Sequence, residues 1–122
     1  MKKTLVIGAS ENPARVSNTA IQKLVAANFP VEAIGLRVGK VGDIPIQKGL
    51  PVLEYIDTVT LYVGKKHQPS YYDYIISLKP QRVIFNPGTE NMEFIKLLKE
   101  NLFKSSSNIS SNYNRWADSS PK

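Results

Sequence analysis

Short continuous apolar runs alternate along this chain with longer segments whose apolar positions repeat every three or four residues. The runs have the length and the β-branched or aromatic content of strands, and they lie at residues 4–7, 31–36, 58–63 and 82–85. The segments with helical spacing lie at residues 17–28, 69–78 and 91–103. The pattern therefore predicts strands and helices in alternation.

Three segments fall outside this alternation. Residues 37–51 are rich in glycine and proline, which predicts a loop, and residues 52–56 predict a short helical turn. Residues 104–122 are rich in serine and asparagine and hold few apolar positions. We therefore divide the chain into a folded domain, residues 1–103, and a C-terminal tail, residues 104–122.

Alternating strands and helices imply a parallel sheet with right-handed crossovers and helices on both faces. The expected fold class is α/β, a Rossmann-like three-layer sandwich with an open parallel sheet of four to five strands. The sequence leaves two alternatives for a fifth strand. The sheet either ends at the fourth apolar run, or residues 107–113 supply a poor edge strand. Ligands of such folds bind beyond the C-terminal ends of the strands, so the loops at that edge form the candidate site.

The composition bounds the classes of site. The chain has 122 residues, 42% of them apolar, with no cysteine and one histidine, His67. This excludes disulfides, thiolate nucleophiles and cysteine metal sites, and we expect no bound metal. No apolar run reaches the roughly 18 residues of a membrane helix, and no secretory signal follows Met1, so we expect a cytoplasmic protein without a membrane partner.

The segment after the first apolar run is typical of a phosphate-binding turn. A turn of small residues lets the backbone approach a ligand, and the N–H groups at the start of the next helix favour an anion. The residues of this loop are Gly8, Ala9, Ser10, Asn12, Pro13, Arg15 and Ser17. A lone glycine after a strand is weak evidence for any particular nucleotide, since the full G-x-G-x-x-G pattern is absent.

The net charge of +6 fits an anionic partner or simply a soluble surface, so the placement of the cations decides. Five cations fall in loops at the expected ligand edge, namely Arg15, Arg37, Lys40, Lys65 and Lys66. The fourth loop adds the neutral groups of Asn86, Gly88 and Thr89. We therefore predict an anion site on this rim.

The end of the second strand narrows the identity of the anion. Proteins that bind NAD through this fold place an acid there for the ribose hydroxyls, whereas this chain has Gly35, Leu36 and Arg37. A cation at this point favours a ribose that carries a phosphate, as in NADP or coenzyme A. The residues alone thus predict a phosphorylated adenosine ligand.

Five motifs follow one another along the chain: Gly8-Ala9-Ser10-Glu11-Asn12-Pro13-Ala14-Arg15, Arg37-Val38-Gly39-Lys40, Gly49-Leu50-Pro51-Val52, Leu61-Tyr62-Val63 and Asn86-Pro87-Gly88-Thr89. With these motifs the chain resembles the small bacterial CoA-binding-domain proteins, a family similar to the amino-terminal CoA-binding domain of the succinyl-CoA synthetase α subunit. The resemblance covers about residues 3–100 and implies CoA or an acyl-CoA as ligand. It implies that the loop from Gly8 to Ser17 faces the CoA phosphates, that Arg37 and Lys40 lie at the phosphorylated ribose, and that Gly64, Lys65 and Lys66 line the adenine side.

No catalytic constellation can be assembled from the sequence. His67 has no neighbouring acid to orient it, and Ser10 and Ser17 have no base partner. The leading hypothesis is a module that binds CoA or an acyl-CoA without catalysis of its own. Two alternatives stay open, a small NADP-binding enzyme or redox sensor and an interaction subunit with a decayed site. A protein partner or a homodimer also stays open, and without a recognised motif we do not expect nucleic acid.

Overall fold

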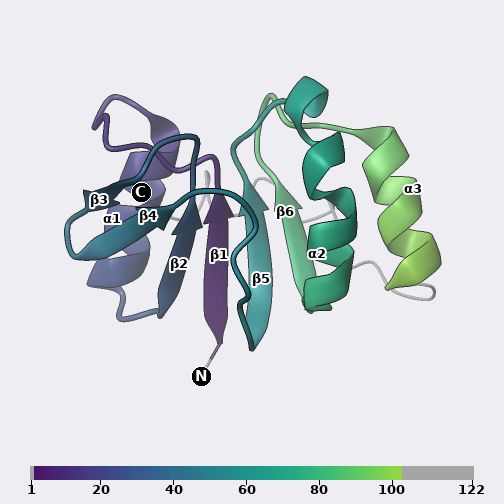
Figure 1. The fold of residues 1–122 in the computed structure, drawn as a ribbon, viewed down its shortest axis with the longest axis horizontal. Helices are drawn as coiled ribbons and strands as arrows, with labels where there is room; N and C mark the ends of the chain where they lie inside the picture. Colours follow the sequence, from purple (N-terminus) through teal and green to yellow (C-terminus); the bar gives the residue numbers. More distant parts are fainter. Residues whose placement is uncertain (1, 103–122) are drawn as a thin grey trace.

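The computed structural model describes residues 2–102, which form one sheet with helices on both faces (Figure 1). The elements in chain order are β1 (Lys3–Ile7), α1 (Val16–Ala26), β2 (Val31–Ile34), β3 (Gly39–Val41), β4 (Ile44–Gln47), β5 (Ile56–Leu61), the 3-10 helices η1 (Lys65–His67) and η2 (Pro69–Tyr71), α2 (Tyr72–Leu78), β6 (Arg82–Phe85) and α3 (Met92–Asn101). In Figure 1, α1 lies behind the sheet and α2 and α3 lie in front of it. The predicted α/β, Rossmann-like class is confirmed.

The sheet has six strands in the order β3-β4-β2-β1-β5-β6. β1 pairs in parallel with β2 and β5, β2 with β4, and β5 with β6, whereas β3 is antiparallel to β4. The chain leaves β1 toward β2 on one side and later returns to β5 on the other, so the strand order reverses between β1 and β5. In an open α/β sheet, the crevice at this switch point is where ligands bind.

The expectation of four to five strands was wrong, because part of the expected loop at residues 37–51 forms two strands. Residues 39–47 make the hairpin β3–β4, with Gly42 at its turn in the left-handed region, at φ 60°. The expected helical turn at residues 52–56 is also absent. Tyr55 has φ 62°, which interrupts a right-handed helix, and Ile56 already pairs with Lys3 of β1.

Each face of the sheet carries its own apolar core. On the face covered by α1, Val6, Ala33 and Ile46 from three strands meet Ile21 and Leu24 of the helix, all nearly or completely buried. This contact is why the apolar spacing of residues 17–28 becomes a helix, although Asn28, at φ 65°, ends it earlier than predicted.

An aromatic cluster holds α2 and α3 on the opposite face. The rings of Tyr72 and Phe94 stack at 4.3 Å, and Phe94 meets Phe85 of β6 edge to face at 5.8 Å. Both phenylalanines are completely buried. Helices on both faces of the sheet were predicted, and the two cores confirm this.

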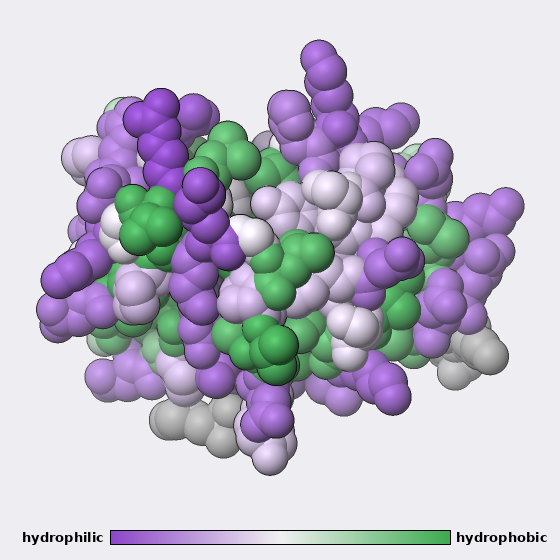
Figure 2. Space-filling model, in the orientation of Figure 1, coloured by the Kyte–Doolittle hydropathy of each residue, from purple (hydrophilic) through white to green (hydrophobic). Residues whose placement is uncertain are grey.

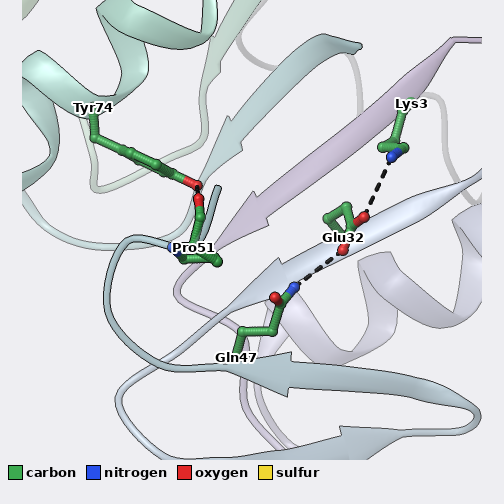
Figure 3. A network of polar contacts seen from close by, with 5 residues as sticks. All are labelled: Lys3, Glu32, Gln47, Pro51 and Tyr74. Atoms are coloured by element: carbon green, nitrogen blue, oxygen red, sulfur yellow. Dashed lines mark hydrogen bonds and ion pairs between the residues drawn. The ribbon is translucent and has the colours of Figure 1, made fainter. Parts of the chain in front are cut away.

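Polar contacts fix the connection between β4 and β5 where it crosses the face that carries α2 (Figure 3). The Tyr74 hydroxyl donates to the carbonyl of Pro51 at 2.6 Å. Beside it, Glu32 accepts from Lys3 at 3.3 Å and from Gln47 at 3.0 Å. Burial, together with the negative charge of Glu32, raises the pKa of Tyr74 to about 12, so this hydroxyl is a neutral donor at ordinary pH.

The predicted tail, residues 104–122, and its possible edge strand at residues 107–113 lie outside the described residues. No helix within residues 2–102 has the length and apolar character needed to span a membrane.

Candidate functional site

The loops that follow β1, β2, β5 and β6 meet at one edge of the sheet, because these strands are parallel. Figure 2 shows hydrophilic side chains projecting from this edge. We call these four loops the rim: residues 8–15, 35–38, 62–68 and 86–91. The rim lies at the switch point between β1 and β5, where open α/β sheets bind their ligands.

Gly8 brings the first loop into backbone contact with the loop after β5 at the switch point. This residue has φ 102°, and a Cβ built on it would lie 2.9 Å from the carbonyl carbon of Tyr62. The N–H of Tyr62 in turn donates to Ile7 O at 2.8 Å. The loops after β1 and β5 therefore touch where they diverge, and only glycine fits the contact.

A second close approach joins the loops after β1 and β2. The N–H groups of Gly8 and Ala9 both donate to Ile34 O at 2.9 Å, and a Cβ on Gly35 would lie 2.4 Å from Ala9 O. Side chains are thus excluded from both sides of the first loop. Both glycines therefore allow neighbouring loops to pack backbone against backbone, which fixes the path of the first loop at the switch point.

The polar side chains of the first loop shape the loop itself. Ser10 Oγ accepts from the Asn12 N–H at 3.1 Å, and Asn12 Oδ1 accepts from the Ala14 N–H at 2.9 Å. Asn18 of α1, 3% exposed, donates to Ser10 O at 2.9 Å. Ser10 and Asn12, which the sequence proposed as ligand contacts, here make turns that direct the chain into α1.

The start of α1 offers backbone donors to an anion. Arg15 is its N-cap residue, no side chain caps the helix within the described chain, and its first turn holds no acidic residue. Ser17, in this turn, is 3% exposed. The first-turn amides and the positive end of the helix dipole therefore favour an anion at this position.

The cations of the site are exposed and available. Arg15, Arg37, Lys65 and Lys66 follow the C-terminal ends of β1, β2 and β5, and within residues 2–102 none of them is ion-paired. Lys40 lies in the strand β3 and not in a loop as expected, and its backbone N–H bonds to Glu11 of the first loop. Its neighbour Val41 is buried against the α1 face, so the Lys40 side chain leaves the hairpin on the opposite face.

Glu11 ties the first loop to the hairpin, a contact that the sequence does not reveal. Its carboxylate accepts from the backbone N–H of Lys40 at 3.0 Å. Its side chain lies against Gly39, where a Cβ would come 2.3 Å from Glu11 Cδ. One negative charge thus stands beside the predicted anion site.

The polar groups of the fourth loop, residues 86–91, hydrogen-bond mainly within the loop and to the start of α3. The Gly88 N–H donates to Glu90 Oε1 at 2.9 Å, and the Thr89 hydroxyl, buried, donates to Asn86 O at 2.7 Å. The start of α3 is capped by Asn91, which accepts from the Phe94 N–H. Unlike the start of α1, this loop does not favour a phosphate.

One buried acceptor at the rim has no partner in the described structure. Asn86 is 2% exposed, and its amide nitrogen donates to Thr60 Oγ1 at 2.7 Å and to Leu61 O at 2.8 Å, while its Oδ1 stays unsatisfied. The same Thr60 hydroxyl contacts Tyr62, whose pKa is raised by burial. An orphaned acceptor of this kind needs a donor, and Asn86 lies in the rim directly after β6.

The rim holds no arranged acid, base and nucleophile. His67 is exposed in η1, and the described chain places no carboxylate against it. Within residues 2–102, no group of histidine, aspartate and glutamate side chains is arranged to hold a metal ion. The exposed cations of the rim and the start of α1 support the binding of an anion.

Fold and rim together define an open α/β protein of Rossmann-like topology whose strand order reverses between β1 and β5. The chain belongs to the CoA binding domain family, which matches it over residues 2–109. The resemblance seen in the sequence is thereby confirmed. Among proteins with curated descriptions, none matches the chain.

Solved structures share this fold. The crystal structure of an uncharacterised protein, 43% identical, covers 90% of this chain and 89% of its own, with a TM-score of 0.82. A conserved hypothetical protein from Pyrococcus furiosus, 20% identical, covers 83% of this chain and 88% of its own at a TM-score of 0.73. A hypothetical protein from Pyrococcus horikoshii OT3, 24% identical, covers 89% of this chain and 75% of its own at 0.77. The two archaeal structures show the fold alone.

Proposed function

We propose that this protein binds CoA or an acyl-CoA at the rim and holds it without transforming it. The observation that carries the proposal is the start of α1, which no side chain caps within residues 2–102 and which lies in the rim among exposed cations without an ion pair in that range. Membership of the CoA binding domain family supports the ligand class. The absence of an arranged base or nucleophile in the described chain supports binding without catalysis.

The rim is electrically asymmetric, which supports an orientation of the ligand. Arg15 and Arg37 follow β1 and β2, whereas the loop after β6 presents Asn86 and holds the carboxylate of Glu90. Neighbouring strands lie about 4.8 Å apart, so β2 and β6, three positions apart in the sheet, are separated by about 14 Å. An extended ligand with phosphates at one end and a neutral amide-bearing arm at the other fits this rim.

A phosphorylated ribose is favoured at the end of β2. An acid that would accept from two free ribose hydroxyls is missing there, since Gly35 and Leu36 are followed by Arg37. The Arg37 guanidinium is exposed and can pair with a phosphate in a bidentate way. This supports CoA over dephospho-CoA and NAD.

Isothermal titration with CoA, dephospho-CoA, NADP and NAD tests the proposal. We expect CoA to bind most tightly and NAD most weakly. Arg37→Ala should remove most of the preference for CoA over dephospho-CoA. A lost charged contact of roughly 1.5 kcal/mol lowers the ratio of the two affinities about tenfold. Lys23→Ala is the matched control, because Lys23 is an exposed cation in the last turn of α1, at the end of the helix that points away from the rim. Equal indifference to all four nucleotides would refute the proposal, and tighter binding of NADP than CoA would replace it with an NADP site.

A further inference from the structure

A completely buried glutamine joins the loops after β5 and β6. Gln68 is 0% exposed, although it lies in the polar stretch between His67 and Pro69. Its amide nitrogen donates to Val63 O at 3.0 Å and to Thr89 O at 2.8 Å, so each of its two hydrogens reaches a different loop.

Asn91 completes the link from the other side. Its amide nitrogen donates to Gln68 Oε1 at 2.9 Å and to the Tyr72 hydroxyl at 2.8 Å, while its Oδ1 caps α3 through the Phe94 N–H at 3.1 Å. Asn91 is 1% exposed. Every amide hydrogen and both carbonyl oxygens of Gln68 and Asn91 therefore have a partner, as a buried polar network requires.

The groups that this pair holds are the backbone segments of the candidate site. Val63 precedes Gly64, Lys65 and Lys66, and Thr89 follows Gly88 in the neighbouring loop. Neither amide faces solvent, so neither contacts a ligand itself. What the network fixes is the distance and angle between two loops that have no strand pairing with each other.

We infer that Gln68 and Asn91 are positioning residues that preorganise the β5 and β6 side of the ligand site. The inference rests on the proposed function, because it assumes that the ligand contacts these two loops. Preorganised loops avoid the ordering cost that mobile loops incur on binding, and this cost appears directly in the affinity. On the β1 and β2 side the side-chain contact between loop and hairpin, from the Lys40 N–H to Glu11, is exposed and not buried.

The decisive variant is Asn91→Asp. Aspartate keeps the acceptor that caps α3 but has no amide hydrogens for Gln68 and Tyr72, so the link breaks while the helix start stays capped. Gln68→Met removes the same link from the other residue at similar volume. The control is Ile75→Val, which lowers stability through a fully buried residue of α2 without a contact to either amide.

CoA affinity is measured by titration well below the melting temperature of every variant, and amide hydrogen exchange is followed in residues 62–68 and 86–91. We expect both link variants to bind CoA about five- to tenfold more weakly, with faster exchange in both loops, and Ile75→Val to bind as the wild type does. Wild-type affinity in the link variants, or an equal loss in Ile75→Val, overturns the inference. A wild-type protein that binds no CoA overturns the proposed function first, and the inference falls with it.

Discussion

Adding a single methyl group at Gly35 tests whether the first loop is built around a close backbone contact. The Cβ of Gly35→Ala would lie 2.4 Å from Ala9 O and 2.9 Å from Ile46 Cγ2. Ordinary contacts begin near 3.4 Å, so the carbonyl has to retreat by about 1 Å. Overpacking of this kind costs about 1–3 kcal/mol, and the retreat moves the two amides that bond to Ile34 O.

Urea and thermal denaturation of Gly35→Ala measure this cost. For a domain of this size, about 1 kcal/mol corresponds to a shift of about 4–8 °C in melting temperature. Gly64→Ala is the matched control, because Gly64 has φ −66° and nothing lies within 4 Å of its Cβ position, so it should be neutral or stabilising by about 0.4–1 kcal/mol. Equal stabilities of the two variants would refute the reasoning about the contact.

Three further predictions concern the rim and the connection behind it. Glu11→Gln removes a negative charge but keeps an acceptor for the Lys40 N–H, so CoA should bind about two- to fivefold more tightly in a titration, and weaker binding would show that the charge aids the ligand. CoA affinity should fall several-fold as salt is raised, since the cations of the rim are exposed, and a flat salt dependence would argue against a charged site. The pKa of Tyr74, raised to about 12 in the fold from an ordinary 10.0, makes the protein lose stability as pH rises from 10 to 12. Denaturation at pH 10 and at pH 12 should show a smaller fall in the free energy of unfolding for Tyr74→Phe than for the wild type. An identical fall would assign the loss of stability to Tyr62 and Tyr72, whose pKa values are also raised.

The alternation of apolar runs and helical segments was sufficient to predict the fold class. β6 is found at the predicted residues, and β1 differs by one residue. These strands are central or have a clear apolar period, so local pattern and tertiary burial agree. The same agreement predicted the position of the first loop, because a strand that ends at a glycine and precedes a helix is typical of the first turn of a parallel α/β sheet.

The hairpin β3–β4 escaped prediction because its residues read locally as a turn-rich loop. Gly39, Gly42 and Pro45 all disfavour strands in isolation. In the fold, Gly42 makes the turn, Gly39 makes room for Glu11, and Ile46 pairs with Ala33 of β2. The strands form because β2 offers a free edge, a long-range fact that no window of this segment contains. Lys40, expected in a loop, lies in β3 for the same reason.

Gln68 shows why the interior of the site could not be predicted. It lies in the run Lys65-Lys66-His67-Gln68-Pro69, where every local indicator favours exposure, and an unpaired buried amide would cost several kcal/mol. Burial is tolerated only because Thr89 and Asn91, more than twenty residues away, supply partners at 2.8 and 2.9 Å. Thr89 and Asn91 lie in the loop after β6, whereas Gln68 lies in the loop after β5. The polar amide of Gln68, which predicts exposure in the sequence, therefore joins the two loops in the fold.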